Sequence, residues 1–200
     1  MRFKTFLLFS ILLSTVLSAL PVGAWFKQEG QIRPEASLSR DEDNRRYFTD
    51  LTVVTHEGKE LRFYSDILKD RVVLINFFYV DCPTSPPDMA KLSEVQKRLT
   101  DYESQIHFVS ISVDPEKDTP KAVREYVQQY KPGKGRLFLT GKKENIDMIN
   151  RKLGNTNTNP EMHLQAFLLG NLRTGHWMKM NRLAPVASVV EGLRILAEEK

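Results

Sequence analysis

Cysteine is almost absent from this sequence, which contains a single one, Cys82, among 200 residues. An intrachain disulfide is therefore excluded, and so is a zinc site built from several cysteines. A lone thiol is inert, reactive, joined to a second molecule or bound to a metal. Cys82 is for this reason the first residue to consider for function.

An excess of one charge sign is also missing. The chain carries 29 Lys and Arg against 25 Asp and Glu, a net charge of +4, and no basic cluster is interleaved with aromatic residues. Nucleic-acid binding is therefore not expected. The sequence has no phosphate-cradling glycine loop and no recognisable Ser/His/Asp arrangement, so it lacks the common signatures of nucleotide-binding proteins and serine hydrolases.

No apolar run is long enough to make a typical membrane-spanning helix. Residues 6–20 are uncharged and mostly apolar, but a spanning helix needs about 20 such residues. Arg2 and Lys4 precede this run and small residues follow it up to Ala24, which predicts a signal peptide over residues 1–24. We expect export to the periplasm or cell envelope. The alternative is an uncleaved anchor that tethers the chain to the inner membrane, its one expected membrane contact.

The rest of the chain reads as a polar linker followed by one domain. Residues 25–45 are rich in charged and polar side chains, so they predict a linker, and residues 46–200 predict a single domain. Near its start, two β-rich runs at 51–55 and 60–64 flank a turn and predict a hairpin.

Strand and helix signals alternate through the domain. The nearly continuous apolar run 71–80 predicts a strand buried on both faces, and Ser85 is a suitable cap for the helix that follows. Further strands are expected at 106–113 and 136–140, a hairpin at 164–180, and helices beginning near Pro120, after 141 and near Ala187. This order predicts an α/β protein with a mixed sheet.

Cys82 lies where the strand at 71–80 gives way to the following helix. A helix N-terminus favours a thiolate over a thiol. The alternative is a buried structural cysteine, because free cysteine is among the most buried residue types. Asp81 and the prolines that follow Cys82 favour a loop, so we favour the functional interpretation.

His163 is the second candidate, because it follows the polar loop 154–162 and precedes a predicted strand. A lone histidine often has only a packing role, so local sequence alone supports this assignment weakly. His56, in a hairpin turn, and His107, inside a strand, are weaker candidates still.

Two other motifs have structural explanations. Asp114 ends a buried strand, and Asp118 or Thr119 is expected to cap the next helix. An acid or metal role for Asp114 is the less favoured alternative.

His176, Met178 and Met180 share one face of a predicted strand and could hold Cu(I). Packing of the hairpin against the core is the favoured interpretation.

These motifs together resemble the SCO/SenC family of copper-handling, thioredoxin-fold proteins. The resemblance rests on "RVVLINFFYVDCP" (71–83), "FVSISVDPEKDTP" (108–120), "FLTGKKENI" (138–146) and His163, and it extends over about 51–196. It implies a thioredoxin-like fold with a mixed central sheet, flanking helices and an added N-terminal β-hairpin. It also implies copper delivery to the copper site of cytochrome c oxidase, or maintenance of the thiols of that site. The expected partner is the copper subunit of the oxidase or another exported copper protein. Such a protein is a metallochaperone more than an enzyme; as an enzyme it would be a thiol-disulfide oxidoreductase.

The family site is a Cys-x-x-x-Cys-Pro loop plus one histidine. By this resemblance Cys82 matches the first cysteine, His163 matches the histidine, and Pro87 matches the proline after the second cysteine. The second cysteine itself is replaced by Pro86, which has no donor atom. The resemblance thus implies copper bound by Cys82 and His163, with a third ligand from solvent, a partner or Met162. The family's aspartate-proline-glycine turn is replaced here by "GNLRTG" (170–175).

Two alternatives remain open at this point. In the first, Cys82 is a catalytic thiol that acts through mixed disulfides or reacts with peroxide. The segment "CPT" is similar to peroxiredoxins, although the threonine they place three residues earlier is Tyr79 here. In the second, the chain is a binding module that keeps the fold and has lost the metal chemistry.

Overall fold

The computed structural model describes residues 39–83 and 85–199. The predicted signal peptide and residues 25–38 of the predicted linker lie outside this part. Among the described residues, no helix combines the length and the apolar character needed to cross a membrane.

The first described element is a helix that the sequence analysis does not predict. Helix α1 (Arg40–Phe48) begins after Ser39, whose hydroxyl accepts a hydrogen bond from the Glu42 N–H while the Glu42 carboxylate bonds back to the Ser39 N–H. This reciprocal capping box stabilises a helix start in an otherwise polar segment. Phe48 is buried and packs against Trp177, with ring centroids 5.4 Å apart. Residues 40–45, which the sequence predicts to be part of a polar linker, therefore belong to a helix.

Seven strands form one mixed sheet in the order β2-β1-β5-β4-β3-β6-β7. Strands β3, β4 and β5 run parallel, whereas β1 is antiparallel to β2 and β5, and β6 is antiparallel to β3 and β7. The strands are β1 (Thr52–Thr55), β2 (Glu60–Arg62), β3 (Val72–Phe78), β4 (Ile106–Ser112), β5 (Arg136–Thr140), β6 (Ala166–Asn171) and β7 (His176–Asn181).

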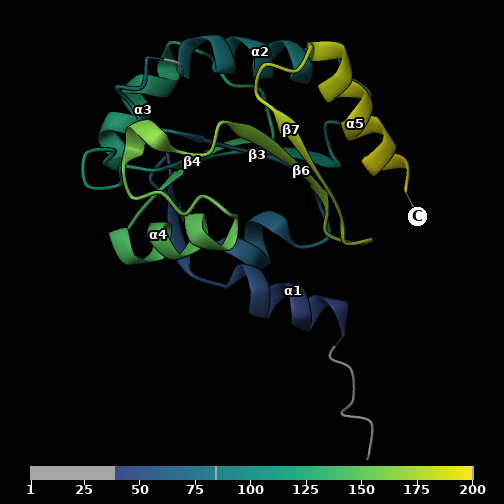
Figure 1. The fold of residues 1–200 in the computed structure, drawn as a ribbon, viewed down its shortest axis with the longest axis horizontal. Coiled ribbons are helices and arrows are strands. Elements are labelled where there is room, and N and C mark those ends of the chain that lie inside the picture. Colours follow the sequence, from purple (N-terminus) through teal and green to yellow (C-terminus); the bar gives the residue numbers. More distant parts are fainter. Residues whose placement is uncertain (1–38, 84, 200) are drawn as a thin grey trace, which may run out of the picture. The chain divides into compact units, whose positions relative to one another are not determined.

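Helices cover both faces of the sheet (Figure 1). They are α2 (Ser85–Lys97), α3 (Pro120–Gln128), α4 (Lys143–Lys152) and α5 (Val186–Glu198), with a π-helix η2 (Phe63–Leu68) and the 3₁₀ turns η3 (Thr100–Tyr102) and η4 (Pro160–Met162). Alternation along β3 divides the core: Val73 and Ile75 pack with residues of α1, η2 and α4, while Val72 and Leu74 pack with α2 and α5. Because every residue of β3 is buried, its sequence is a continuous apolar run broken only by Asn76.

The fold confirms the prediction of an α/β protein with a mixed central sheet, flanking helices and an N-terminal hairpin. β1 and β2 form that hairpin, with Val53 opposite Leu61. One helix boundary differs, since α2 already includes Ser85 as its first residue and Pro86 and Pro87 follow in the first turn. A shift of one residue is within the usual ambiguity of helix ends.

Candidate metal centre

The topology brings three loops to one edge of the sheet. Parallel strands β3 and β4 pair up to Phe78 and Ser112, so the loops that follow them leave the sheet side by side. β6 runs antiparallel to β3, with Ile75 opposite Leu168, so β6 begins at the edge where β3 ends. Cys82 follows β3 and His163 precedes β6. The sheet therefore places the two predicted site residues at the same edge.

An open cavity of about 1010 Å³ lies at this edge, and both residues line it. We call it the Cys82 cavity. Tyr79, Met162 and Gln165 line it as well. Cys82 and His163 are each only 6% exposed, so they lie in its wall, whereas Met162 is 65% exposed.

Cys82 is held in a tight turn between β3 and α2. Its N–H donates to the carbonyl of Tyr79 at 3.1 Å, and its own carbonyl accepts from the N–H of Ser85 at 3.1 Å. The Tyr79 side chain also hydrogen-bonds the Cys82 sulfur. Burial, followed by the neighbouring Cys82, raises the pKa of the Tyr79 hydroxyl. Tyr79 therefore remains a neutral phenol that can donate a hydrogen bond to a thiolate.

The same tyrosine contacts the histidine. The rings of Tyr79 and His163 meet edge to face, with centroids 6.0 Å apart and an interplanar angle of 88°. Such pairs are a preferred aromatic geometry. Tyr79 thus links the thiol and the imidazole, a role that the sequence analysis does not identify.

The tautomer of His163 follows from its hydrogen bonds. Nδ1 lies 2.7 Å from the carbonyl oxygen of Pro160. A carbonyl can only accept, so Nδ1 carries the proton and the lone pair of the neutral ring is on Nε2. A backbone carbonyl bonded to one ring nitrogen is the usual support of a metal-binding histidine, because it fixes the orientation of the other nitrogen.

The side-chain amide of Gln165 hydrogen-bonds to the Nε2 lone pair of His163. The Gln165 side-chain nitrogen lies 3.1 Å from His163 Nε2 and 3.3 Å from the His163 carbonyl oxygen. The carbonyl requires a donor at this position, so the nearby atom is the amide nitrogen and it donates to Nε2 as well. A metal can reach Nε2 only when this amide moves away.

The donor atoms fit Cu(I). Thiolate, imidazole and thioether are the ligand types that this soft ion prefers, and Cys82, His163 and Met162 supply one each to the wall of one cavity. Pro86 is exposed in the first turn of α2 and supplies none. Within residues 39–83 and 85–199 no group of three or more His, Cys, Asp or Glu is arranged to hold a metal. Any metal here would therefore rest on two or three soft donors and keep an open position.

Asp118 fixes the loop that carries Cys82. It is 1% exposed, and its carboxylate accepts from the N–H of Val80 at 3.0 Å and from the hydroxyl of Ser112 at 2.6 Å. Thr119, and not Asp118, caps α3 by accepting from the Ala122 N–H. The side chain of Asp118 therefore joins the loop after β3 to the end of β4.

Asp118 should make folding stability depend on pH. Burial raises its pKa from 3.8 to about 6, against the opposing effect of its hydrogen bonds with Ser112 and Val80. The folded chain therefore holds a proton between about pH 4 and 6 that the unfolded chain has released, and the stability this gives is lost as the pH rises through that window. In Asp118→Asn this loss is absent. We expect the free energy of unfolding of the variant, relative to the parent chain, to rise by on the order of 3 kcal/mol from pH 4 to pH 7 in urea titrations. Parallel curves for the two proteins, like those expected for the exposed control Asp101→Asn, would contradict this.

The weaker candidates lie elsewhere. The ring of His56 packs edge to face on Phe138, and His107 lies within β4. Neither lines the Cys82 cavity. Burial lowers the pKa of both imidazoles, which keeps them neutral in the fold. Asp114 forms an ion pair with Lys117 at 3.1 Å, consistent with its structural interpretation.

The histidine and methionines of β7 also have structural roles. His176 bonds Glu199 at the end of α5. Met178 and Met180 pack against the core, and a Cβ added to Gly192 of α5 would lie 2.7 Å from the Met180 methyl group. These contacts agree with packing beneath α5, which was the favoured interpretation.

The fold and the site together define a thioredoxin-like protein with one thiol and one imidazole in a shared cavity. Residues 40–165, more than half of the sequence, match the SCO1/SenC family. The chain belongs to the SCO1/SenC family.

Individual relatives agree with this assignment. An SCO2-like protein of Rickettsia conorii is 31% identical over 136 residues, which cover 66% of this chain and 64% of the relative. The chain thus spans just under two thirds of the length of that relative. Two solved structures share the fold. BsSco, described as a member of the Sco family of cytochrome c oxidase assembly proteins, is 24% identical, with a TM-score of 0.64 over 76% of this chain and 94% of its own. ScoI of Bradyrhizobium japonicum, solved with copper bound, is 22% identical, with a TM-score of 0.60 over 72% and 96%.

Proposed function

We propose that this chain is an exported Sco protein that binds Cu(I) through Cys82 and His163 and delivers it during assembly of the copper site of cytochrome c oxidase. Family membership supports both parts of this proposal, as does the likeness to BsSco, a member of a family of cytochrome c oxidase assembly proteins, and to ScoI, solved with copper bound. The observation that carries the proposal is the hydrogen bond from His163 Nδ1 to the Pro160 carbonyl. It leaves Nε2 as the donor atom in a cavity that also holds the thiol.

The absence of a second cysteine favours transfer of Cu(I) over its storage. Cys82 and His163 would leave a coordination position open, which a thiolate of the client can enter before either protein ligand leaves. Each step is then a ligand exchange at Cu(I) in which no electron moves. The described chain cannot close its own disulfide, so any thiol maintenance would need a second thiol from another molecule.

Gln165 should weaken copper binding by competing for His163. Gln165→Leu removes the amide donor at an exposed position, so Nε2 no longer has to break a hydrogen bond before it binds the metal. A hydrogen bond contributes about 0.5–1.5 kcal/mol net, so we expect Cu(I) affinity to rise by about 2- to 10-fold. Competition with a chromophoric Cu(I) chelator measures this. The matched control is Gln128→Leu on α3, and equal affinities for the parent chain and both variants would contradict the role of Gln165.

Delivery is tested with the client. Loss of the gene in its own cells should reduce cytochrome c oxidase activity, and the parent chain but not Cys82→Ser should restore it. The same strain tests the location, because the mature chain should be recovered from the periplasmic or envelope fraction after loss of residues 1–24. Full oxidase activity without the gene would contradict the proposed client.

The two alternatives give different results in the same assays. A thiol protein acting by mixed disulfides would react with peroxide or a partner disulfide whether or not copper is present. A binding module that has lost the metal chemistry would bind its partner equally well in the parent chain and in the Cys82→Ser variant. It would not remove Cu(I) from the chelator.

A further inference from the structure

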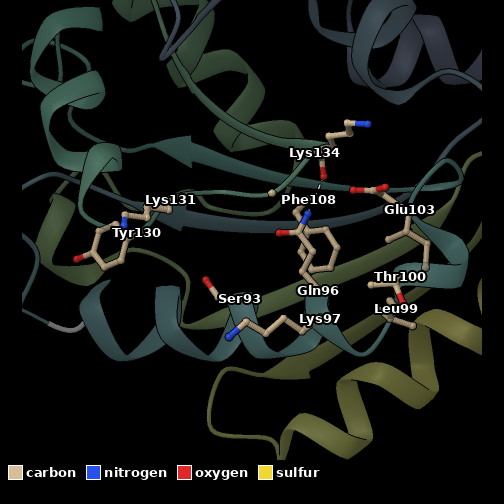
Figure 2. Close-up of a pocket in the computed structure, with 12 residues that line it drawn as sticks. Ser93, Gln96, Lys97, Leu99, Thr100, Glu103, Phe108, Tyr130, Lys131 and Lys134 are labelled. Atoms are coloured by element: carbon tan, nitrogen blue, oxygen red, sulfur yellow. Dashed lines mark hydrogen bonds between the residues drawn. The ribbon is translucent and has the colours of Figure 1, made fainter.

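A second cavity, of about 410 Å³, lies away from Cys82. It is lined by the C-terminal half of α2, by η3, by the start of β4 and by the connection between α3 and β5 (Figure 2). Leu99, Ile106 and Phe108 line it and are 3%, 2% and 2% exposed. Its volume falls within the range of small-molecule sites, about 300–1,000 Å³.

The rim of the second cavity is positively charged. Lys97, Lys131 and Lys134 line it, against one acidic residue, Glu103. All four side chains are exposed, and none of them makes an ion pair within the described part of the chain. The backbone at Lys134 is held close to α2, because the side chain of Gln96 donates to the Lys134 carbonyl at 2.6 Å (Figure 2).

A buried arginine adds to this charge. Arg136 of β5 is 3% exposed, and its guanidinium donates to the hydroxyl of Ser93 at 2.8 Å; Ser93 in turn lines the second cavity. Burial lowers its pKa to about 10, so it is still charged at neutral pH. The guanidinium also donates to Met89 and lies over the ring of Phe138, while its Nε has no hydrogen-bond partner. No carboxylate among the described residues forms an ion pair with it. A buried cation without a counter-ion is costly to the fold.

We propose that the second cavity binds a small organic carboxylate with an apolar body. The apolar part would lie on the buried floor beside Phe108, and the carboxylate would lie among the rim lysines, where it would also offset the charge of Arg136 behind Ser93. Neutral and cationic molecules of the same shape lack the negative charge that the rim lysines and Arg136 would attract. The site is independent of Cys82 and His163, so it does not rest on the proposed copper function.

Three matched probes test the proposal: 2-naphthoate, neutral 2-naphthalenemethanol and the cation 2-naphthylmethylammonium. Calorimetric titration of the purified full chain should show that the carboxylate binds at least about 10-fold more tightly than the alcohol, because a hydrogen bond to a charged group is stronger than one between neutral groups. The cation should not bind. Cys82→Ser should leave all three results unchanged.

Two variants test whether the carboxylate binds in the second cavity. The triple variant Lys97→Gln, Lys131→Gln, Lys134→Gln should reduce carboxylate affinity to that of the alcohol, while Thr100→Trp, which fills the cavity from an exposed rim position, should abolish binding of both. The control is an equal loss of charge at exposed lysines elsewhere: Lys59→Gln, Lys121→Gln, Lys142→Gln. Circular dichroism checks that each variant is folded. Failure of 2-naphthoate to bind at millimolar concentration, or equal binding by the two triple variants, would overturn the proposal.

Discussion

Cys82→Ser should lower the affinity of the chain for Cu(I) by on the order of 100-fold or more. Loss of an outer-sphere support already costs about 10- to 100-fold at metal sites, and here the only thiolate of the chain is removed. Serine keeps the size of the side chain but offers a hard oxygen donor that Cu(I) binds poorly. Met162, the remaining soft donor in the Cys82 cavity besides His163, is 65% exposed.

The measurement is a competition titration with a Cu(I) chelator under reducing conditions. His163→Ala should also lower the affinity, and the double variant should lose little more than Cys82→Ser alone, because the two residues hold one ion. His56→Ala, at a histidine outside the Cys82 cavity, is the matched control and should be neutral. An affinity that is the same in the parent chain and in Cys82→Ser would exclude a thiolate site.

Pro86→Cys should have the opposite effect and raise Cu(I) affinity by on the order of 100-fold, the gain expected from restoring a second thiolate to the site. The backbone can accept this change. Pro86 lies exposed in the first turn of α2, where the new N–H needs no intrahelical partner. Cys82 lies in the turn just before this helix, and its carbonyl accepts from the N–H of Ser85, the first residue of α2, so the new thiol would lie close to it. The same variant should form an intrachain disulfide on oxidation.

Pro87→Cys is a sharp control for this gain. Pro87 is also an exposed first-turn proline, but one residue along an α-helix turns the side chain by about 100° away from its predecessor. The second thiol should then point away from the Cys82 cavity and add little affinity. Equal gains from the two substitutions would mean that a second sulfur acts anywhere near the loop, and that the site geometry of the family is not retained.

The fold could be predicted well because its signals are local. The apolar run of β3, the prolines of α2 and the two-residue alternation of the hairpins each determine one element. Helix α1 was missed because its segment is strongly polar, and its signal is only the four-residue pattern from Ser39 to Glu42. The strand order could not be predicted from these signals, since pairing depends on contacts between residues far apart in the chain.

The candidate site could be predicted only in part, for the same reason. Cys82 and His163 were identified by motif and by resemblance, and the antiparallel pairing of β6 with β3 brings them to one cavity. Asp118 resembles an ordinary helix cap in the sequence, and its role in holding the Cys82 loop depends on a contact with Val80, 38 residues away. Nothing in the sequence distinguishes Gln165 from other exposed polar residues.

X-ray absorption at the copper edge is the most direct test of the central claim that Cys82 and His163 bind one Cu(I) ion. The chain loaded with one equivalent of Cu(I) should show both a sulfur scatterer and the outer-shell pattern of an imidazole. The imidazole pattern should disappear in His163→Ala while the sulfur remains, and the sulfur should disappear in Cys82→Ser, apart from any weaker thioether. Spectra without an imidazole in the parent chain, or an imidazole signal unchanged in His163→Ala, would contradict the account.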